Sequence, residues 1–187
     1  LYNISGACYN ALGQLEAAVK SYEQALAIKP DYADAHYNLG VTLQDFGQLE
    51  AAVKSYEQAL AIKPDYAEAH YNLGNTLKAL GQLEAAVKSY EQALAIKPDY
   101  AEARYNLGNT LNDLGQLVEA VKSYEQALAI KPDYAEAHSN LGVTLKELGQ
   151  LEKAVKRYEQ ALAIKPDYAE AHSNLGVTLK ELGQLEA

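Results

Sequence analysis

Apolar residues recur at helical spacing in two stretches of a unit that is copied along the chain. Within residues 33–66 they are Ala35, Leu39, Gly40, Leu43 and Phe46 in the first stretch and Leu49, Ala52, Val53, Tyr56, Ala59, Leu60 and Ile62 in the second. Spacings of three, four and seven residues indicate one apolar face of a helix, whereas a strand would alternate. Gly47 divides the stretches, so each unit is predicted to be a hairpin of two helices.

The unit repeats with a strict period. Lys-Pro-Asp-Tyr-Ala occurs five times, each copy 34 residues after the last, beginning at Lys29, Lys63, Lys97, Lys131 and Lys165. Such a period is typical of an array in which each hairpin stacks on its neighbours, and not of a globular domain with one core. We therefore expect one array over 1–187, with units at 1–32, 33–66, 67–100, 101–134 and 135–168 and a half unit at 169–187. We also expect this sequence to be a piece of a longer array.

Helix start and stop signals agree with this division. Asp65 and Glu68 have the spacing of a capping box, which returns at Asp99/Glu102, Asp133/Glu136 and Asp167/Glu170 and more weakly at Asp31/Asp34. Pro64 is predicted to end the preceding helix, since proline has no N–H and disfavours helix at the residue before it. Gly47 has the position of a left-handed residue that closes the first helix.

A second glycine of each unit lies inside the first helix. Its copies are Gly40, Gly74, Gly108, Gly142 and Gly176. Glycine costs about 1 kcal/mol relative to alanine in a helix interior, so its repetition there needs a packing reason. We expect a close approach of the two helices, with the rings of Tyr56, Tyr90, Tyr124 or Tyr158 beside the glycine.

Composition narrows the class of partner. The net charge of −9 argues against nucleic acid, which requires a surplus of Lys and Arg, and against an anionic membrane surface. The single cysteine, Cys8, excludes an intrachain disulfide and a cysteine-based metal site. We expect no metal or other cofactor and no enzymatic activity, because the sequence shows no Ser/His/Asp set, phosphate-binding glycine loop or zinc motif. The histidines are expected to pack, since copies on neighbouring units lie too far apart to share one ion.

One run of residues resembles a known repeat family. Ala-Glu-Ala-His-Tyr-Asn-Leu-Gly at 67–74, followed by Leu77, Gly81, Ala86, Tyr90, Ala93 and Pro98, resembles the tetratricopeptide repeat, and the match extends along the whole chain. The resemblance implies an all-α solenoid of antiparallel helix hairpins, stacked into a right-handed superhelix. It also implies that the first helix of every unit lines the concave side, where the family binds protein or peptide partners.

The positions expected on that side form three ladders along the array. The second, fifth, sixth, ninth, twelfth and thirteenth positions of a unit share one stripe of the first helix. From residue 33 onward, the sixth position is asparagine, the fifth is tyrosine in three units and then serine, and the second is acidic. The ladders are Asn38, Asn72, Asn106, Asn140 and Asn174; Tyr37, Tyr71 and Tyr105, continued by Ser139 and Ser173; and Asp34, Glu68, Glu102, Glu136 and Glu170, with Asn75 and Asn109 at the ninth position.

These ladders favour a partner in extended conformation. A carboxamide carries both donors and an acceptor, matching a peptide backbone, and tyrosine adds rigid contact area. The asparagine ladder is similar to that of the repeat region of O-linked N-acetylglucosamine transferases. The family's clamp for acidic C-termini needs Lys or Arg at the second, fifth and sixth positions, where this chain has none. We therefore expect a neutral or basic segment, although the asparagines could also be ordinary solvated residues and the carboxylates caps.

Two alternatives remain open from the sequence. The first is head-to-tail self-association, because residues 169–182 lack the full second helix that would cover Leu175, Leu179 and Leu182. The second is that the array is the adaptor region of a larger enzyme, such as a glycosyl- or sulfotransferase.

Overall fold

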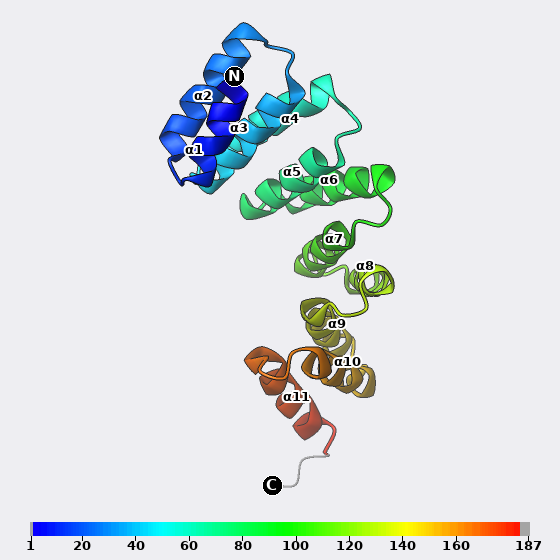
Figure 1. The fold of residues 1–187 in the computed structure, drawn as a ribbon. Helices are drawn as coiled ribbons and strands as arrows, with labels where there is room; N and C mark the ends of the chain where they lie inside the picture. Colours follow the sequence, from blue (N-terminus) through cyan, green and yellow to red (C-terminus); the bar gives the residue numbers. More distant parts are fainter. Residues whose placement is uncertain (1, 184–187) are drawn as a thin grey trace. The chain divides into compact units, whose positions relative to one another are not determined.

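The computed structural model describes residues 2–183, and every regular element in that range is an α-helix (Figure 1). The chain divides into two compact units, Leu1–Pro98 and Asp99–Ala187. From here on, the first and second unit mean these two parts, and each 34-residue repeat is called a hairpin. The first contains α1 (Tyr2–Ala11), α2 (Leu15–Ile28), α3 (Ala33–Asp45), α4 (Leu49–Ile62), α5 (Ala67–Ala79) and α6 (Leu83–Ile96). The second contains α7 (Ala101–Asp113), α8 (Leu117–Ile130), α9 (Ala135–Glu147), α10 (Leu151–Ile164) and α11 (Ala169–Glu181).

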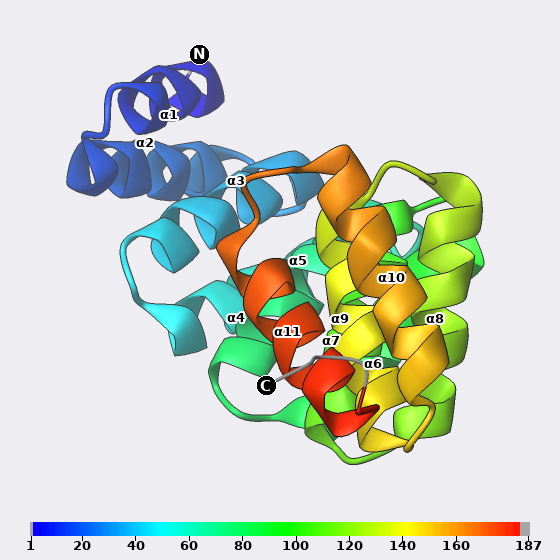
Figure 2. The same cartoon turned by 90° about the horizontal axis from the view of Figure 1, so that it is seen from below.

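Odd-numbered helices are the first helices of the predicted hairpins, and even-numbered helices are the second. In the first unit α1 packs on α2, α3 on α4 and α5 on α6, while α2 contacts α3 and α4 contacts α5. In the second unit α7 packs on α8 and α9 on α10, while α8 contacts α9 and α10 contacts α11, as Figures 1 and 2 show. The prediction of an all-α solenoid of helix hairpins is confirmed. No described helix has the length and apolar character needed to cross a membrane.

The glycine at the end of each first helix has the predicted left-handed conformation. Gly47 has φ of 77°, and its copies in the other hairpins have φ between 67° and 74°. The amide of Gly47 donates to Gln44 O at 3.0 Å, and the amide of Gln48 donates to Leu43 O at 2.8 Å. These two bonds are those of a Schellman motif, and they satisfy carbonyls that the end of the helix would otherwise leave open.

The glycine inside each first helix that a described second helix follows accommodates a buried tyrosine of that second helix, as predicted. A Cβ built on Gly40 would lie 2.7 Å from Cε1 of Tyr56, and one on Gly142 would lie 2.6 Å from Cε1 of Tyr158. Both tyrosines have no exposed surface, so neither ring has room to move away. At Gly176 a Cβ would meet no atom within 4 Å. The repeated glycine is therefore a packing requirement wherever a second helix follows in the described chain.

The capping-box prediction is wrong. The first helices begin one residue later than the sequence suggested, so Tyr66, and not Asp65, occupies the N-cap of α5, where no side chain caps the helix. The amides of Ala69 and His70 bond to the backbone oxygen of Tyr66 at 3.0 and 3.1 Å. Glu68 thus lies in the first turn, where a negative charge favours the helix dipole without closing a box. The other first helices with a described N-cap, α3, α7, α9 and α11, likewise have a tyrosine cap without a side-chain bond.

Candidate functional site

Asparagines of the first unit are tied to the hairpin that precedes them. Asn72 Nδ2 donates to the hydroxyl of Tyr37 at 3.0 Å, and Asn38 Nδ2 donates to Asn3 Oδ1 at 3.3 Å. The two partners in each pair lie 35 residues apart and belong to neighbouring first helices. Asn72 is half-buried, and its Oδ1 has no partner within residues 2–183. The structure thus brings the predicted Asn and Tyr ladders together and uses one side of each carboxamide.

The second unit repeats this arrangement and then breaks it. Asn140 Nδ2 donates to the hydroxyl of Tyr105 at 3.0 Å and also to Asn109 Oδ1 at 2.8 Å. Ser139 occupies the tyrosine position of the next hairpin, and it is too short to reach Asn174. Asn174 makes no side-chain hydrogen bond to any described residue and is half-buried. The residue at the fifth position of one first helix therefore determines whether the asparagine side chain of the next first helix is hydrogen-bonded.

The asparagines at the ninth position have a structural role that the sequence did not reveal. Asn75 Oδ1 accepts from the hydroxyl of Tyr90 at 2.8 Å, and Asn109 Oδ1 accepts from that of Tyr124 at 2.7 Å. These hydroxyls belong to the rings packed on the internal glycines, and a buried hydroxyl without an acceptor is costly. Asn75 and Asn109, predicted for partner binding, therefore serve the core with their oxygen atoms.

In hairpins with valine at the ninth position, the hydroxyl of the buried tyrosine has a different acceptor or has none among the described residues. In α3 the acceptor is Gln44, whose Oε1 receives the hydroxyls of Tyr56 and Thr76, each at 2.9 Å. In α9 neither Val143 nor Lys146 can accept. The hydroxyl of Tyr158 is buried without a partner among the described residues. Burial raises the pKa of Tyr158 to about 12, so the hydroxyl stays protonated.

The acidic ladder meets the lysine of the repeated Lys-Pro-Asp-Tyr-Ala motif. The oxygen of Glu68 lies 4.0 Å from Lys97 Nζ, and that of Glu102 lies 3.9 Å from Lys131 Nζ. All four side chains are between 44% and 48% exposed, so these ion pairs are weak and open to solvent. Lys131 Nζ also lies 4.6 Å from the ring centre of Tyr134. The carboxylates remain accessible to a partner.

Tyr37 and Tyr105 of the tyrosine ladder pack against neighbouring rings at a tilt, and burial raises the pKa of both hydroxyls. The ring centre of Tyr37 lies 4.8 Å from that of Tyr66 and 6.0 Å from that of Tyr56. Tyr105 stands in the same relation to Tyr134 at 4.8 Å and to Tyr124 at 6.1 Å. Burial raises the pKa of Tyr37, with a further contribution from the charge of Glu68, so its hydroxyl both accepts from Asn72 and retains a hydrogen to donate.

The histidines hold the joint between hairpins, a role that the sequence did not indicate. His36, His70, His138 and His172 each place Nε2 between 2.8 and 3.0 Å from the carbonyl of the proline six residues earlier. A carbonyl only accepts, so Nε2 carries the hydrogen in every case. Arg104, which replaces the histidine in α7, donates to Gln126 Oε1 at 2.5 Å. Within the described part of the chain, no group of His, Cys, Asp or Glu side chains could hold a metal ion.

Comparison with known proteins identifies the repeat. A family model described as TPR repeat matches residues 6–47, 45–81, 74–112, 108–149 and 144–183. A crystal structure of MamA is 27% identical with a TM-score of 0.84, and the match covers 88% of this chain and 96% of that one. YrrB, described as a TPR protein with an unusual peptide-binding site, is 27% identical with a TM-score of 0.82 over 92% of this chain and 89% of its own. TTC0263, a thermophilic TPR protein of Thermus thermophilus, is 27% identical with a TM-score of 0.68, covering 96% and 97%. Comparison with curated proteins finds no match.

Proposed function

The chain belongs to the tetratricopeptide repeat family, whose members are generally protein-interaction scaffolds and typically non-enzymatic, and we propose that its first helices hold an extended, neutral or basic protein segment. The proposal rests chiefly on one observation. Asn72 is fixed through Nδ2 by Tyr37, while its Oδ1 has no partner among the described residues.

A fixed carboxamide with an open oxygen is suited to a peptide N–H. The hydrogen bond to Tyr37 orients Asn72 before a partner arrives, which lowers the entropy cost of binding. Asn140 is oriented in the same way by Tyr105 in the second unit. A backbone N–H is present at every residue except proline, so such acceptors select an extended backbone and not a particular sequence.

The charges beside this row favour donors over acceptors in the partner. Glu68 and Glu102 lie one helical turn before Asn72 and Asn106 and are about half exposed. Their lysine partners are 3.9–4.0 Å away, so a cation of the partner can compete for them. Tyr37, Tyr71 and Tyr105 add contact area with a polar tip. YrrB, which shares the fold, has a peptide-binding site, and this supports the assignment of a peptide to the same class of surface.

The proposal is tested by an array of immobilised peptides that differ in net charge. Asn38 and Asn72 are changed together to alanine in the first unit, and Asn140 and Asn174 in the second. Gln92→Ala, at an exposed position of α6, is the matched control. We expect each pair of changes to weaken binding of neutral and basic peptides by at least about tenfold. Unchanged binding by all variants would overturn the proposal.

End-to-end association is a second candidate, favoured by the exposed apolar residues of the outermost described helices. On α1, Ile4 is 69% exposed, and Leu12 just after it is 70% exposed. On α11, Leu175 and Leu179 are half-exposed, as is Leu182 at its end, whereas Leu141 and Leu145 at equivalent positions of α9 are buried. Sedimentation over a range of concentrations measures this directly. A chain that stays monomeric while it binds peptide would exclude assembly as the function.

A further inference from the structure

The second helices of the first unit are identical in sequence, whereas those of the second unit depart from that sequence. α2, α4 and α6 share the sequence LEAAVKSYEQALAI. α8 departs from it at Val118 and Glu119, and α10 departs at Lys153 and Arg157. The departures in α10 replace an alanine and a serine by cations. α10 therefore has three cations, Lys153, Lys156 and Arg157, against two carboxylates, while α4 has one cation against two.

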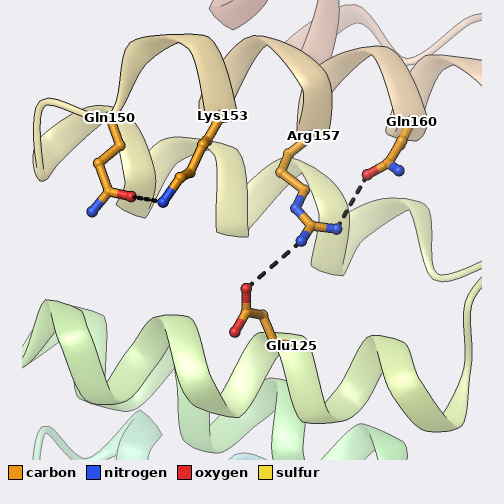
Figure 3. A network of polar contacts seen from close by, with 5 residues as sticks. All are labelled: Glu125, Gln150, Lys153, Arg157 and Gln160. Carbon is orange, nitrogen blue, oxygen red and sulfur yellow. Dashed lines mark hydrogen bonds and ion pairs between the residues drawn. The ribbon is translucent and has the colours of Figure 1, made fainter.

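These cations line a groove between α8 and α10. One hollow of 430 Å³ is bordered by Val121, Glu125, Leu145, Gln150, Lys153, Lys156, Arg157 and Gln160. A neighbouring hollow of 380 Å³ shares Glu125, Arg157 and Gln160 and extends to His138. We name these two hollows together the α8–α10 groove. Figure 3 shows Lys153 and Arg157 projecting from α10 toward α8, with Glu125 facing them.

The cations of the groove retain donors for a ligand. Arg157 lies 3.7 Å from an oxygen of Glu125 and donates to Gln160 Oε1 at 3.2 Å, while Lys153 donates to Gln150 Oε1 at 2.8 Å. A guanidinium has five N–H donors, so most of those of Arg157 remain open. Arg157 is held in place by its two partners and is 29% exposed, which suits it to a planar carboxylate.

The position of Arg157 has a different role in the other hairpins. There it is a buried serine, and Ser55 donates to the carbonyl of Ala51 at 3.1 Å. Apart from Lys153 and Arg157, every residue bordering the 430 Å³ hollow has the same type at the equivalent position of the first hairpins, namely Val19, Glu23, Leu43, Gln48, Lys54 and Gln58. Two substitutions thus convert an ordinary packing surface into a basic one in a chain whose net charge is −9.

We propose that the α8–α10 groove is a second binding surface, which takes an acidic protein segment with a carboxylate beside an aliphatic side chain. The carboxylate binds Arg157 and the ammonium groups of Lys153 and Lys156, where three cations outweigh Glu125. The aliphatic side chain lies against Val121 and Leu145. This surface has its charged residues on second helices and selects the opposite charge from the one proposed for the first helices, so one chain can hold an acidic and a basic segment at once.

The repeat provides a matched pair of variants to test this. Lys153→Ala with Arg157→Ser gives α10 the sequence of α4, so the fold is kept and only the cations are lost. Ala51→Lys with Ser55→Arg installs the same cations on α4, where the other bordering residues are already present. Circular dichroism verifies that both variants remain helical. The probe is a fluorescein-labelled peptide of alternating Asp and Leu, with Asn/Leu and Lys/Leu peptides as controls.

Fluorescence anisotropy should show wild type binding the Asp/Leu peptide at least about tenfold more tightly than the Asn/Leu peptide. The variant that lacks Lys153 and Arg157 should lose this preference, and the variant with cations on α4 should bind a second equivalent of peptide. Changing Asn38, Asn72 and Asn140 to alanine should leave the preference for the Asp/Leu peptide over the Asn/Leu peptide intact. Equal binding by wild type and the variant without the two cations would overturn the proposal. Displacement of the peptide by acetate at equal concentration would also overturn it, because that result would indicate a simple anion site. Sedimentation as a dimer that depends on Arg157 would overturn it too, because a second copy would then be the occupant.

Discussion

The hairpins α3–α4 and α9–α10 have the same helix lengths and the same joint but different polar chemistry. In both, a first helix of 13 residues meets a second of 14, and an internal glycine lies against a tyrosine with no exposed surface. In α3–α4 the hydroxyl of that tyrosine has an acceptor in Gln44, whereas in α9–α10 that of Tyr158 has none among the described residues. The fifth position of the first helix is Tyr37 in one and Ser139 in the other.

The comparison separates positions that make the solenoid from positions that vary upon it. The glycine against the tyrosine, the ring of that tyrosine and the small alanines cannot change in size without altering how the helices approach. Most positions on the first-helix stripe and in the α8–α10 groove can change because their side chains reach solvent, although Ser139 and Leu145 are buried. Binding properties are therefore expected to differ between hairpins whose backbones follow the same course.

The largest expected effect is on the shared joint. Gly142→Ala places a Cβ 2.6 Å from Tyr158 Cε1, and overpacking outweighs the better helix propensity, for a net loss of about 1–2 kcal/mol of unfolding free energy. Gly176→Ala is the control, since nothing lies within 4 Å, and it should gain up to about 1 kcal/mol. Urea unfolding measures both. Equal effects at the two glycines would contradict the packing argument.

The tyrosine hydroxyls should respond in opposite directions. Tyr56→Phe removes a hydrogen bond to Gln44 and should cost about 1 kcal/mol. Tyr158→Phe removes a buried hydroxyl without a partner among the described residues and should be neutral or stabilising. Val143→Asn should supply the missing acceptor, as Asn109 does for Tyr124, and so stabilise the chain only while Tyr158 is present. A loss of stability in Tyr158→Phe as large as that in Tyr56→Phe would refute this difference.

His138 should make the α9–α10 hairpin sensitive to acid. Burial lowers the pKa of His138, and the charge of Arg157 lowers it further, while the bond to the Pro132 carbonyl opposes this. Because the pKa is lower in the folded state, the unfolded chain binds more protons as the pH falls below about 6.5. The contribution of His138 to the unfolding free energy is therefore fully present above that pH, and it is lost as the pH falls toward the pKa of His138 in the folded state. Unfolding free energies of wild type and His138→Gln, measured at about pH 7.5 and about pH 5.5, should converge at the lower pH; a constant difference would contradict the assignment.

The smallest expected effect concerns the acidic ladder. Glu136 lies 4.0 Å from Lys165, and the two side chains are 46% and 48% exposed. Glu136→Gln should change the unfolding free energy by less than about 0.5 kcal/mol, because such pairs are screened and mobile. Thermal unfolding followed by circular dichroism is sufficient to measure it. A clearly larger loss would give the ladder a structural role and weaken its assignment to partner selection.

The sequence predicted the elements and their packing because the period makes local signals mutually consistent. Gly47 and Pro64 end helices for reasons that lie within a few residues, and the glycine–tyrosine contact follows from residue size. Helix starts were less predictable. Asp65 is a residue type favoured at an N-cap, but the helix begins after Tyr66. The bond between Asn72 and Tyr37 joins residues 35 apart on different helices, and no local pattern reports it.

The most direct test of the first-helix proposal uses the peptide backbone itself. A fluorescein-labelled peptide of alternating Lys and Ala is compared with a copy whose backbone amides are N-methylated, which removes the donors that Asn72 Oδ1 would accept. We expect wild type to bind the unmethylated peptide at least about tenfold more tightly. The variant with Asn38 and Asn72 changed to alanine should lose most of that difference. Equal affinity of wild type for the two peptides would contradict recognition of an extended backbone by the asparagine ladder.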